Sequence, residues 1–151
     1  MRVGAIGPAL LAGALLASAP LLGCAGPEPG LEPVPRPDRA AFAATVLPIL
    51  IEHCANPSCH GRPERALSLF APLKFRADPA RTWLVEPLSP GEIEHDYRAT
   101  AALIDPRDPD GSLLLQKALA RTYHGGGVTL EAEDVPHRAL RAWIAAAEGA
   151  R

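Results

Sequence analysis

Proline is the residue that most restricts how this chain can fold. The 151-residue sequence contains 17 prolines and 13 glycines, and proline cannot continue the hydrogen-bond ladder inside a helix or a sheet. Short helices joined by long loops are therefore expected, rather than long helices or a large sheet. The length allows one domain with one modest core.

The charge balance restricts the class of function. Fifteen Lys and Arg residues stand against 17 Asp and Glu residues, which gives a net charge of −2 with histidine neutral. A protein that binds nucleic acid normally carries a basic surface, because its affinity comes largely from contacts with phosphates. The composition therefore disfavours nucleic acid as a partner.

The N-terminal residues have the pattern of an export signal. Arg2 precedes residues 3–19, which contain no charged side chain, and this stretch is too short and too interrupted by proline for a membrane span. The sequence Leu21-Leu22-Gly23-Cys24 then resembles the lipobox of bacterial lipoproteins, in which the cysteine is acylated. The resemblance implies a signal peptide over residues 1–23 and a lipid on Cys24. The alternative is a plain signal peptide in which Cys24 has no such role.

A linker is expected directly after the candidate lipid-attachment site. Residues 25–37 contain five prolines and no aromatic residue, a composition typical of a semi-rigid extended spacer. We therefore divide the chain into a signal (1–23), a lipidated cysteine with its linker (24–37) and a folded domain (38–151). Because Ala25 follows the cysteine, the lipoprotein resemblance implies an anchor in the outer membrane, facing the periplasm of the cell envelope.

Helical spacing predicts that the folded domain is all-α. Asp38 is a good N-cap for a helix that carries Phe42 and Val46 on one face and runs to His53. Pro48 lies inside this pattern, so a kink or an early end is expected there.

Three further helices are expected along the rest of the domain. A short one begins at Asp78-Pro79 and runs through Leu84, a second begins at Ser112, and the last begins at Glu131 or Asp134. The two tryptophans, Trp83 and Trp143, are expected in the core. The overall prediction is three to five helices with long loops rich in proline and glycine.

The most informative residues are Cys54, Cys59 and His60. The usual motif for covalent haem attachment is C-x-x-C-H, and here four residues separate the two cysteines. Two thiols can form thioethers with the two vinyl groups of haem, and the adjacent histidine supplies an axial nitrogen to the iron. The wider spacing requires the intervening residues to loop out, which Asn56-Pro57 favours. By spacing alone, a Cys54–Cys59 disulfide and a zinc site remain alternatives.

Three segments in order resemble the single-haem c-type cytochrome domains of cell-envelope lipoproteins. They are AFAATVLPILIEHCANPSCHG (residues 41–61), IDPRDPDGSLLLQKAL (104–119) and LRAWIAAA (140–147). The resemblance implies a small class I cytochrome c-like helical domain with haem c as its covalent cofactor. It also implies electron transfer with redox partner proteins.

The distal iron ligand departs from the family pattern, which uses methionine. Met1 is the sole methionine and is lost with the signal. His124 is the preferred candidate because it lies between the last two expected helices, where the family places its methionine loop, and the glycines that follow allow close approach of the backbone. His95 is the reserve, His53 lies too close to the cysteines, and His137 is expected at the surface.

The resulting prediction is a membrane-anchored monohaem cytochrome with His60 and His124 on the iron. Two histidine ligands give a lower reduction potential than histidine with methionine. An electron carrier is favoured over an enzyme. The alternatives are a structural or interaction lipoprotein with a Cys54–Cys59 disulfide and no haem, and a haem enzyme or sensor with an open iron site.

Overall fold

The computed structural model of the chain describes residues 36–147, and these residues are helical with no strand among them. An isolated bridge between Ala71 and Phe75 is the one β-type pairing with both partners in this range. The all-α prediction is therefore confirmed for this part. The signal peptide, Cys24 and linker residues 24–35 lie outside the described residues. None of the helices within 36–147 is long and apolar enough to cross a membrane.

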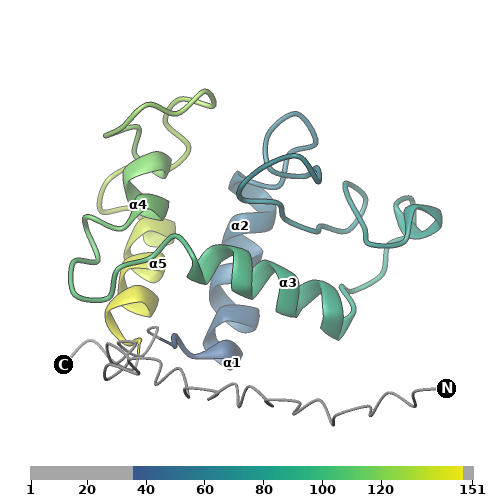
Figure 1. The fold of residues 1–151 in the computed structure, drawn as a ribbon, viewed down its shortest axis with the longest axis horizontal. Helices are drawn as coiled ribbons and strands as arrows, with labels where there is room; N and C mark the ends of the chain where they lie inside the picture. The colour runs from purple at the N-terminus through teal and green to yellow at the C-terminus, as the bar shows by residue number, and fades with distance from the viewer. Residues whose placement is uncertain (1–35, 148–151) are drawn as a thin grey trace, which may run out of the picture. The chain divides into compact units, whose positions relative to one another are not determined.

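The first helix runs without a break from Arg39 to His53 in three segments: α1 (Arg39–Ala41), the π-helical η1 (Phe42–Val46) and α2 (Leu47–His53) (Figure 1). Asp38 caps it by accepting a hydrogen bond from the backbone N–H of Ala41. The early end considered at Pro48 does not occur. The wider π turn lies directly before the proline, where a regular α turn would bring the ring against a carbonyl of the preceding turn.

A 12-residue helix, α3 (Pro90–Ala101), was not predicted, because Pro90 and Gly91 looked like helix breakers. Ser89 is its N-cap and accepts a hydrogen bond from the backbone N–H of Glu92, while the Glu92 carboxylate accepts one from the backbone N–H of Ser89. This capping box, with proline at the first helical position, is a strong start signal. The short helix expected from Asp78 is reduced to the 3₁₀ turn η2 (Pro79–Arg81).

Helices α4 (Leu113–Ala118) and α5 (Val135–Ala145) lie side by side (Figure 1). Ser112, the predicted start of α4, and Asp134, one of the two predicted starts of α5, occupy the N-cap positions of these helices. The chain leaves α4 through Ala120, whose φ of 50° is in the left-handed region. The backbone N–H of Arg121 then donates to the carbonyl of Gln116, which closes the helix end and starts the loop that carries His124.

Three aromatic side chains join η1, α3 and α5 at the centre of the core. The ring of Phe42 lies 5.6 Å from that of Tyr97 and 5.6 Å from that of Trp143. The indole N–H of Trp143 donates to the Asp38 carbonyl, so the last helix is attached to the start of the first. Trp143 is buried as expected, but the expectation for Trp83 was wrong: 81% of its surface is exposed.

Candidate functional site

The segment between the two cysteines forms a closed turn organised by Asn56. The Asn56 carbonyl accepts hydrogen bonds from the backbone N–H groups of Cys59 and Gly61, and its side-chain oxygen accepts from both the N–H and the hydroxyl of Ser58. The backbone N–H of His60 donates to the carbonyl of Cys54 at 3.3 Å. The expected turn at Asn56-Pro57 is therefore present, and it accommodates the two extra residues while keeping the histidine near the first cysteine.

Gly61 is needed for this turn to close. A Cβ atom built at this position would lie 2.5 Å from the Ala55 carbonyl oxygen, which is closer than non-bonded atoms can approach. A side chain at this residue would therefore push the histidine segment away from the end of α2.

Cys54 and Cys59 are half-buried and are not joined to each other. Burial, followed by the neighbouring Cys59, raises the pKa of the Cys54 thiol to about 11. In the protein without a bound cofactor, the thiol of Cys54 is therefore protonated at neutral pH.

His60 and His124 come together from distant parts of the sequence. Their ring centres lie 6.1 Å apart and their planes are 16° from parallel. An imidazole nitrogen binds a metal ion at about 2 Å, so two imidazoles on opposite sides of one ion have ring centres roughly 6 Å apart. An offset aromatic pair falls in the same range of separation, so the arrangement of the ring nitrogens is needed to characterise the pair.

The Nδ1 atoms of both rings are held by backbone carbonyls. Nδ1 of His60 lies 2.7 Å from the Leu67 oxygen, and Nδ1 of His124 lies 2.8 Å from the Gly127 oxygen. A carbonyl only accepts, so each Nδ1 carries the proton and each neutral ring keeps a lone pair on Nε2. Histidines that ligate a metal are usually oriented by a hydrogen bond of this kind.

Electrostatics favour the neutral form of His60. Burial is the main factor that lowers its pKa below the usual value. The hydrogen bond with the Leu67 carbonyl acts in the opposite direction, and the nearby positive charge of Arg65 lowers the pKa further. A neutral imidazole is the form that can donate a lone pair to a metal.

Two cavities of about 260 and 310 Å³ meet at the histidine pair. Both are lined by His60 and His124. The larger one continues between apolar side chains of the core and of α4. These are Leu50, Leu67, Leu103, Leu113, Leu114, Ala118 and Leu140. This slot, apolar along most of its lining and with two imidazoles in its wall, has the composition typical of a small-molecule or cofactor site.

The loop that carries His124 is compact because of its glycines. The backbone N–H of Gly127 donates to the His124 carbonyl, and Gly127 has a φ of +68°, which favours glycine. A Cβ atom at Gly126 would lie 3.3 Å from the His124 ring. The backbone at Gly126 thus passes close to this ring, while the expected approach of the glycines to a porphyrin stays a prediction.

Of the other histidines, His95 and His137 lie away from the pair, whereas His53 shares one of its cavities. His95 lies on α3 with Nε2 3.1 Å from the Ser68 carbonyl and lines neither cavity. His53 lines the smaller cavity from the end of α2. The expectation that His137 is at the surface was wrong, because 1% of it is exposed and its Nδ1 accepts a hydrogen bond from the backbone N–H of Glu133.

Sequence reasoning missed Arg65, which lines both cavities. Its Nε donates to the Cys59 carbonyl at 3.0 Å, so its guanidinium lies next to the cysteine–histidine turn. The short spacing from Cys59 and His60 is the one signal that could have drawn attention to it. A cation at this position suits an anionic substituent of a bound group.

Within residues 36–147, no three His, Cys, Asp or Glu side chains gather in a way that could hold a metal ion by themselves. An axial haem pair requires only two side chains. No family model matches this chain, and the comparisons with curated proteins and with solved structures give no match either.

Proposed function

We propose that this protein is an electron carrier of the c-type cytochrome kind, with one covalent haem. The observation that carries the proposal is the near-parallel pair of His60 and His124, with each Nδ1 held by a carbonyl and each Nε2 free for a metal. The fold proposed with it is a small class I cytochrome c-like domain, which agrees with the all-α architecture of the described residues.

The residues around the slot have the chemistry that a haem requires. Cys54 and Cys59 would each add an S–H bond across one vinyl group, forming two thioethers. His60 would be the proximal ligand and His124 the distal ligand. Haem supplies reversible one-electron chemistry at its iron, while the protein supplies the ligands, the apolar surroundings and the exclusion of water.

The proposed ligand pair determines the class of redox behaviour. Two neutral imidazoles favour a low-spin iron with a lower potential than a histidine–methionine pair gives. With His60 and His124 both holding the iron, small molecules such as carbon monoxide would have no open site. Transfer of electrons between redox partner proteins fits this arrangement better than catalysis at the iron.

The N-terminal sequence supports a location in the cell envelope for the proposed carrier. Cys24 would carry the lipid anchor, and residues 25–37 would hold the domain near the outer membrane on its periplasmic side. Such an anchor would keep the carrier close to membrane-bound donors and acceptors.

The absorption spectrum of the purified protein tests the proposal. A c-type spectrum that remains with the protein after acid–acetone extraction is expected, because thioether bonds survive this treatment. An apoprotein that contains a Cys54–Cys59 disulfide would overturn the proposal in favour of a structural lipoprotein. Binding of carbon monoxide to the reduced protein would instead indicate an open-site haem enzyme or sensor.

A further inference from the structure

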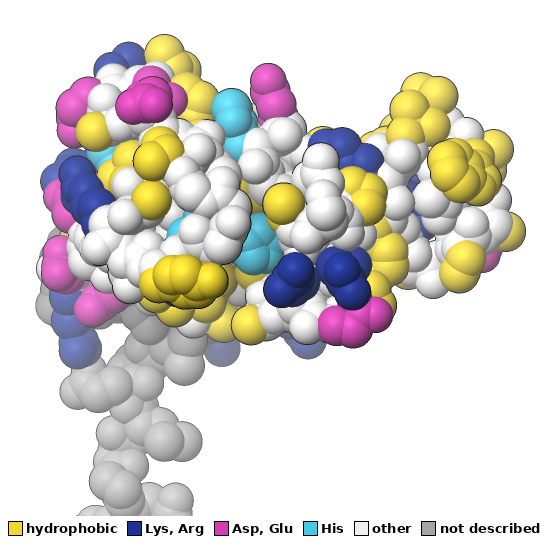
Figure 2. All heavy atoms as spheres, turned by 90° about the horizontal axis from the view of Figure 1, so that it is seen from above, with side chains coloured by type: hydrophobic (Ala, Val, Ile, Leu, Met, Phe, Trp, Pro, Cys, Tyr) yellow, Lys and Arg dark blue, Asp and Glu magenta, His cyan; other side chains and the backbone are white. Residues whose placement is uncertain are grey.

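A loop of residues 71–88, here called the arm, protrudes between α2 and α3 (Figure 1). Three consecutive apolar side chains are exposed at its apex. Trp83, Leu84 and Val85 at its apex are 81%, 43% and 84% exposed. Figure 2 shows hydrophobic side chains gathered at the end of the arm. Single exposed apolar residues are common, but a contiguous group on a protrusion indicates a binding surface.

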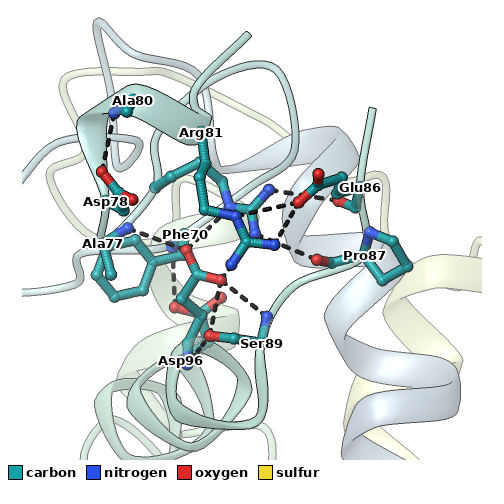
Figure 3. Close-up of polar contacts among 11 residues, drawn as sticks. Phe70, Ala77, Asp78, Ala80, Arg81, Glu86, Pro87, Ser89 and Asp96 are labelled. Carbon is teal, nitrogen blue, oxygen red and sulfur yellow. Dashed lines mark hydrogen bonds and ion pairs between the residues drawn. The ribbon is translucent and has the colours of Figure 1, made fainter. Parts of the chain in front are cut away.

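The arm is held in shape by a buried ion pair at its base. The guanidinium of Arg76, 2% exposed, donates to both carboxylate oxygens of Glu92 at 2.9 Å and to the carbonyls of Glu86 and Pro87. Glu92 also accepts a hydrogen bond from the backbone N–H of Ala77 (Figure 3). Both ends of the apex loop are therefore tied to the start of α3.

A second ion pair connects the two sides of the apex. Arg81 donates to the carboxylate of Glu86 through two of its nitrogens. The residues between them, 82–85, carry no charge. The apex is thus a preorganised, uncharged and apolar tip, which loses little conformational entropy when it binds. An apolar surface suits this tip better than a charged one.

In the proposed function, the chain is anchored to a bilayer through Cys24, a short distance along the sequence from the domain. Arg36 follows Cys24 by 12 residues, and a chain of that length spans at most roughly 40 Å in any conformation. The entry of the chain into the domain is also fixed, because the Pro37 carbonyl accepts a hydrogen bond from the Tyr97 hydroxyl. A domain tethered in this way meets the membrane at a high effective concentration.

From these observations we infer that the apex, Trp83-Leu84-Val85, docks into the interfacial region of the lipid bilayer to which the chain is anchored. The inference rests on the lipid anchor in the proposed function but not on the haem. Tryptophan prefers the membrane interface, where its ring lies among apolar groups and its N–H among polar ones. Docking there would fix the orientation of the domain on the membrane.

Tryptophan quenching in vesicles tests the inference. The lipidated chain is placed in phosphatidylcholine vesicles with and without bromine on the acyl chains, and the ratio of the two emissions is measured. Trp143 is 5% exposed, so the loss of tryptophan emission caused by bromine should come from Trp83. This loss should disappear in Trp83→Phe. In the double variant Leu84→Gln/Val85→Gln, which keeps Trp83, we expect this loss to fall severalfold. Val135→Gln, which changes an exposed valine outside the arm (69% exposed), is the control and should behave as wild type.

A second experiment separates failure of the anchor from failure of the docking surface. Flotation of the chain with the vesicles reports the anchor alone. The unlipidated Cys24→Ser chain should still show bromine-dependent quenching at high lipid concentration, and Leu84→Gln/Val85→Gln should weaken its binding roughly tenfold or more. Equal tryptophan emission with and without bromine, in both the lipidated and the unlipidated chain, would overturn the inference and leave the apex as a surface for a protein partner.

Discussion

The imidazoles of His60 and His124 lie with their centres 6.1 Å apart and their planes 16° from parallel, although 64 residues separate them in the sequence. His60 is positioned by the turn around Asn56, and His124 by a loop that its own carbonyl closes with Gly127. Each ring is oriented independently by a backbone carbonyl. Two separate loops thus bring the two rings together, each with its Nδ1 held by a backbone carbonyl.

Substitution of His124 tests its proposed role on the iron. We expect His124→Ala to convert a low-spin spectrum to a high-spin or five-coordinate one and to allow carbon monoxide to bind the reduced protein, since one axial position opens. The absorption spectrum of both oxidation states is the measurement.

The control for this change is His95→Ala, which removes a histidine that lines neither cavity. Its spectrum should match wild type. An unchanged spectrum in His124→Ala, or a high-spin spectrum in His95→Ala, would assign the distal position to another residue.

Gly61→Ala tests the close packing of the cysteine–histidine turn. The added Cβ meets the Ala55 carbonyl oxygen, so the turn must open, at a cost of about 1–3 kcal/mol in the free energy of unfolding. We also expect the yield of haem-loaded protein to fall. Urea unfolding at pH 7 and the ratio of haem to protein measure the two effects.

Gly91→Ala is the matched control, because a Cβ there meets nothing within 4 Å and the residue lies in the first turn of α3. It should be neutral or slightly stabilising. If both alanine variants behaved alike, the turn at Gly61 would not be as closely packed as described.

The ion pair of Arg76 and Glu92 should be a major determinant of stability. Hydrogen bonds from Arg76 hold the pKa of the Glu92 carboxyl well below its usual value of 4.5. The contribution of the ion pair to the free energy of unfolding is therefore present above pH 4.5 and is lost as the pH falls further. Glu92→Gln leaves the guanidinium buried without its counter-charge and should lower the free energy of unfolding by about 3–5 kcal/mol. A loss below about 1 kcal/mol in urea unfolding at pH 7 would contradict this role.

Asp96 should give the opposite dependence on pH. Its Oδ1 accepts a hydrogen bond from the Phe70 backbone N–H, and its Oδ2 has no hydrogen-bond partner among residues 36–147. Burial raises the pKa of Asp96 from 3.8 to about 7. The folded state therefore holds a proton that the unfolded state releases, and stability falls as the pH rises from about 4 to above 7.

Asp96→Asn removes this titration and can keep the hydrogen bond from Phe70. We expect the variant to be more stable than wild type at pH 8, on the order of 2 kcal/mol, and to differ less from it at pH 4. Thermal unfolding at both pH values checks the sign. A variant less stable than wild type at pH 8 would show that the carboxylate is stabilised by its surroundings.

The sequence predicted the helices whose signals are local. Asp38 and the spacing of Phe42 and Val46 gave the first helix, and Asp134 gave the start of the last one. Helix α3 was missed because Pro90 and Gly91 were read as breakers, although Ser89 and Glu92 form a capping box.

Features that depend on distant contacts could not be predicted in the same way. The burial of Arg76 requires Glu92, which lies on the helix that was missed. The exposure of Trp83 follows from the shape of the arm, which this ion pair fixes. By contrast, the proximity of His60 and His124 was implied by the resemblance to c-type cytochrome domains, while their cofactor stays a prediction.

The intact mass of the mature protein tests the central claim most directly. We predict the mass of the chain from Cys24 onward increased by the acyl groups and by one haem, because two thioethers retain the porphyrin under denaturing conditions. A mass without the porphyrin and lower by two hydrogen atoms, as in a Cys54–Cys59 disulfide, would contradict the account.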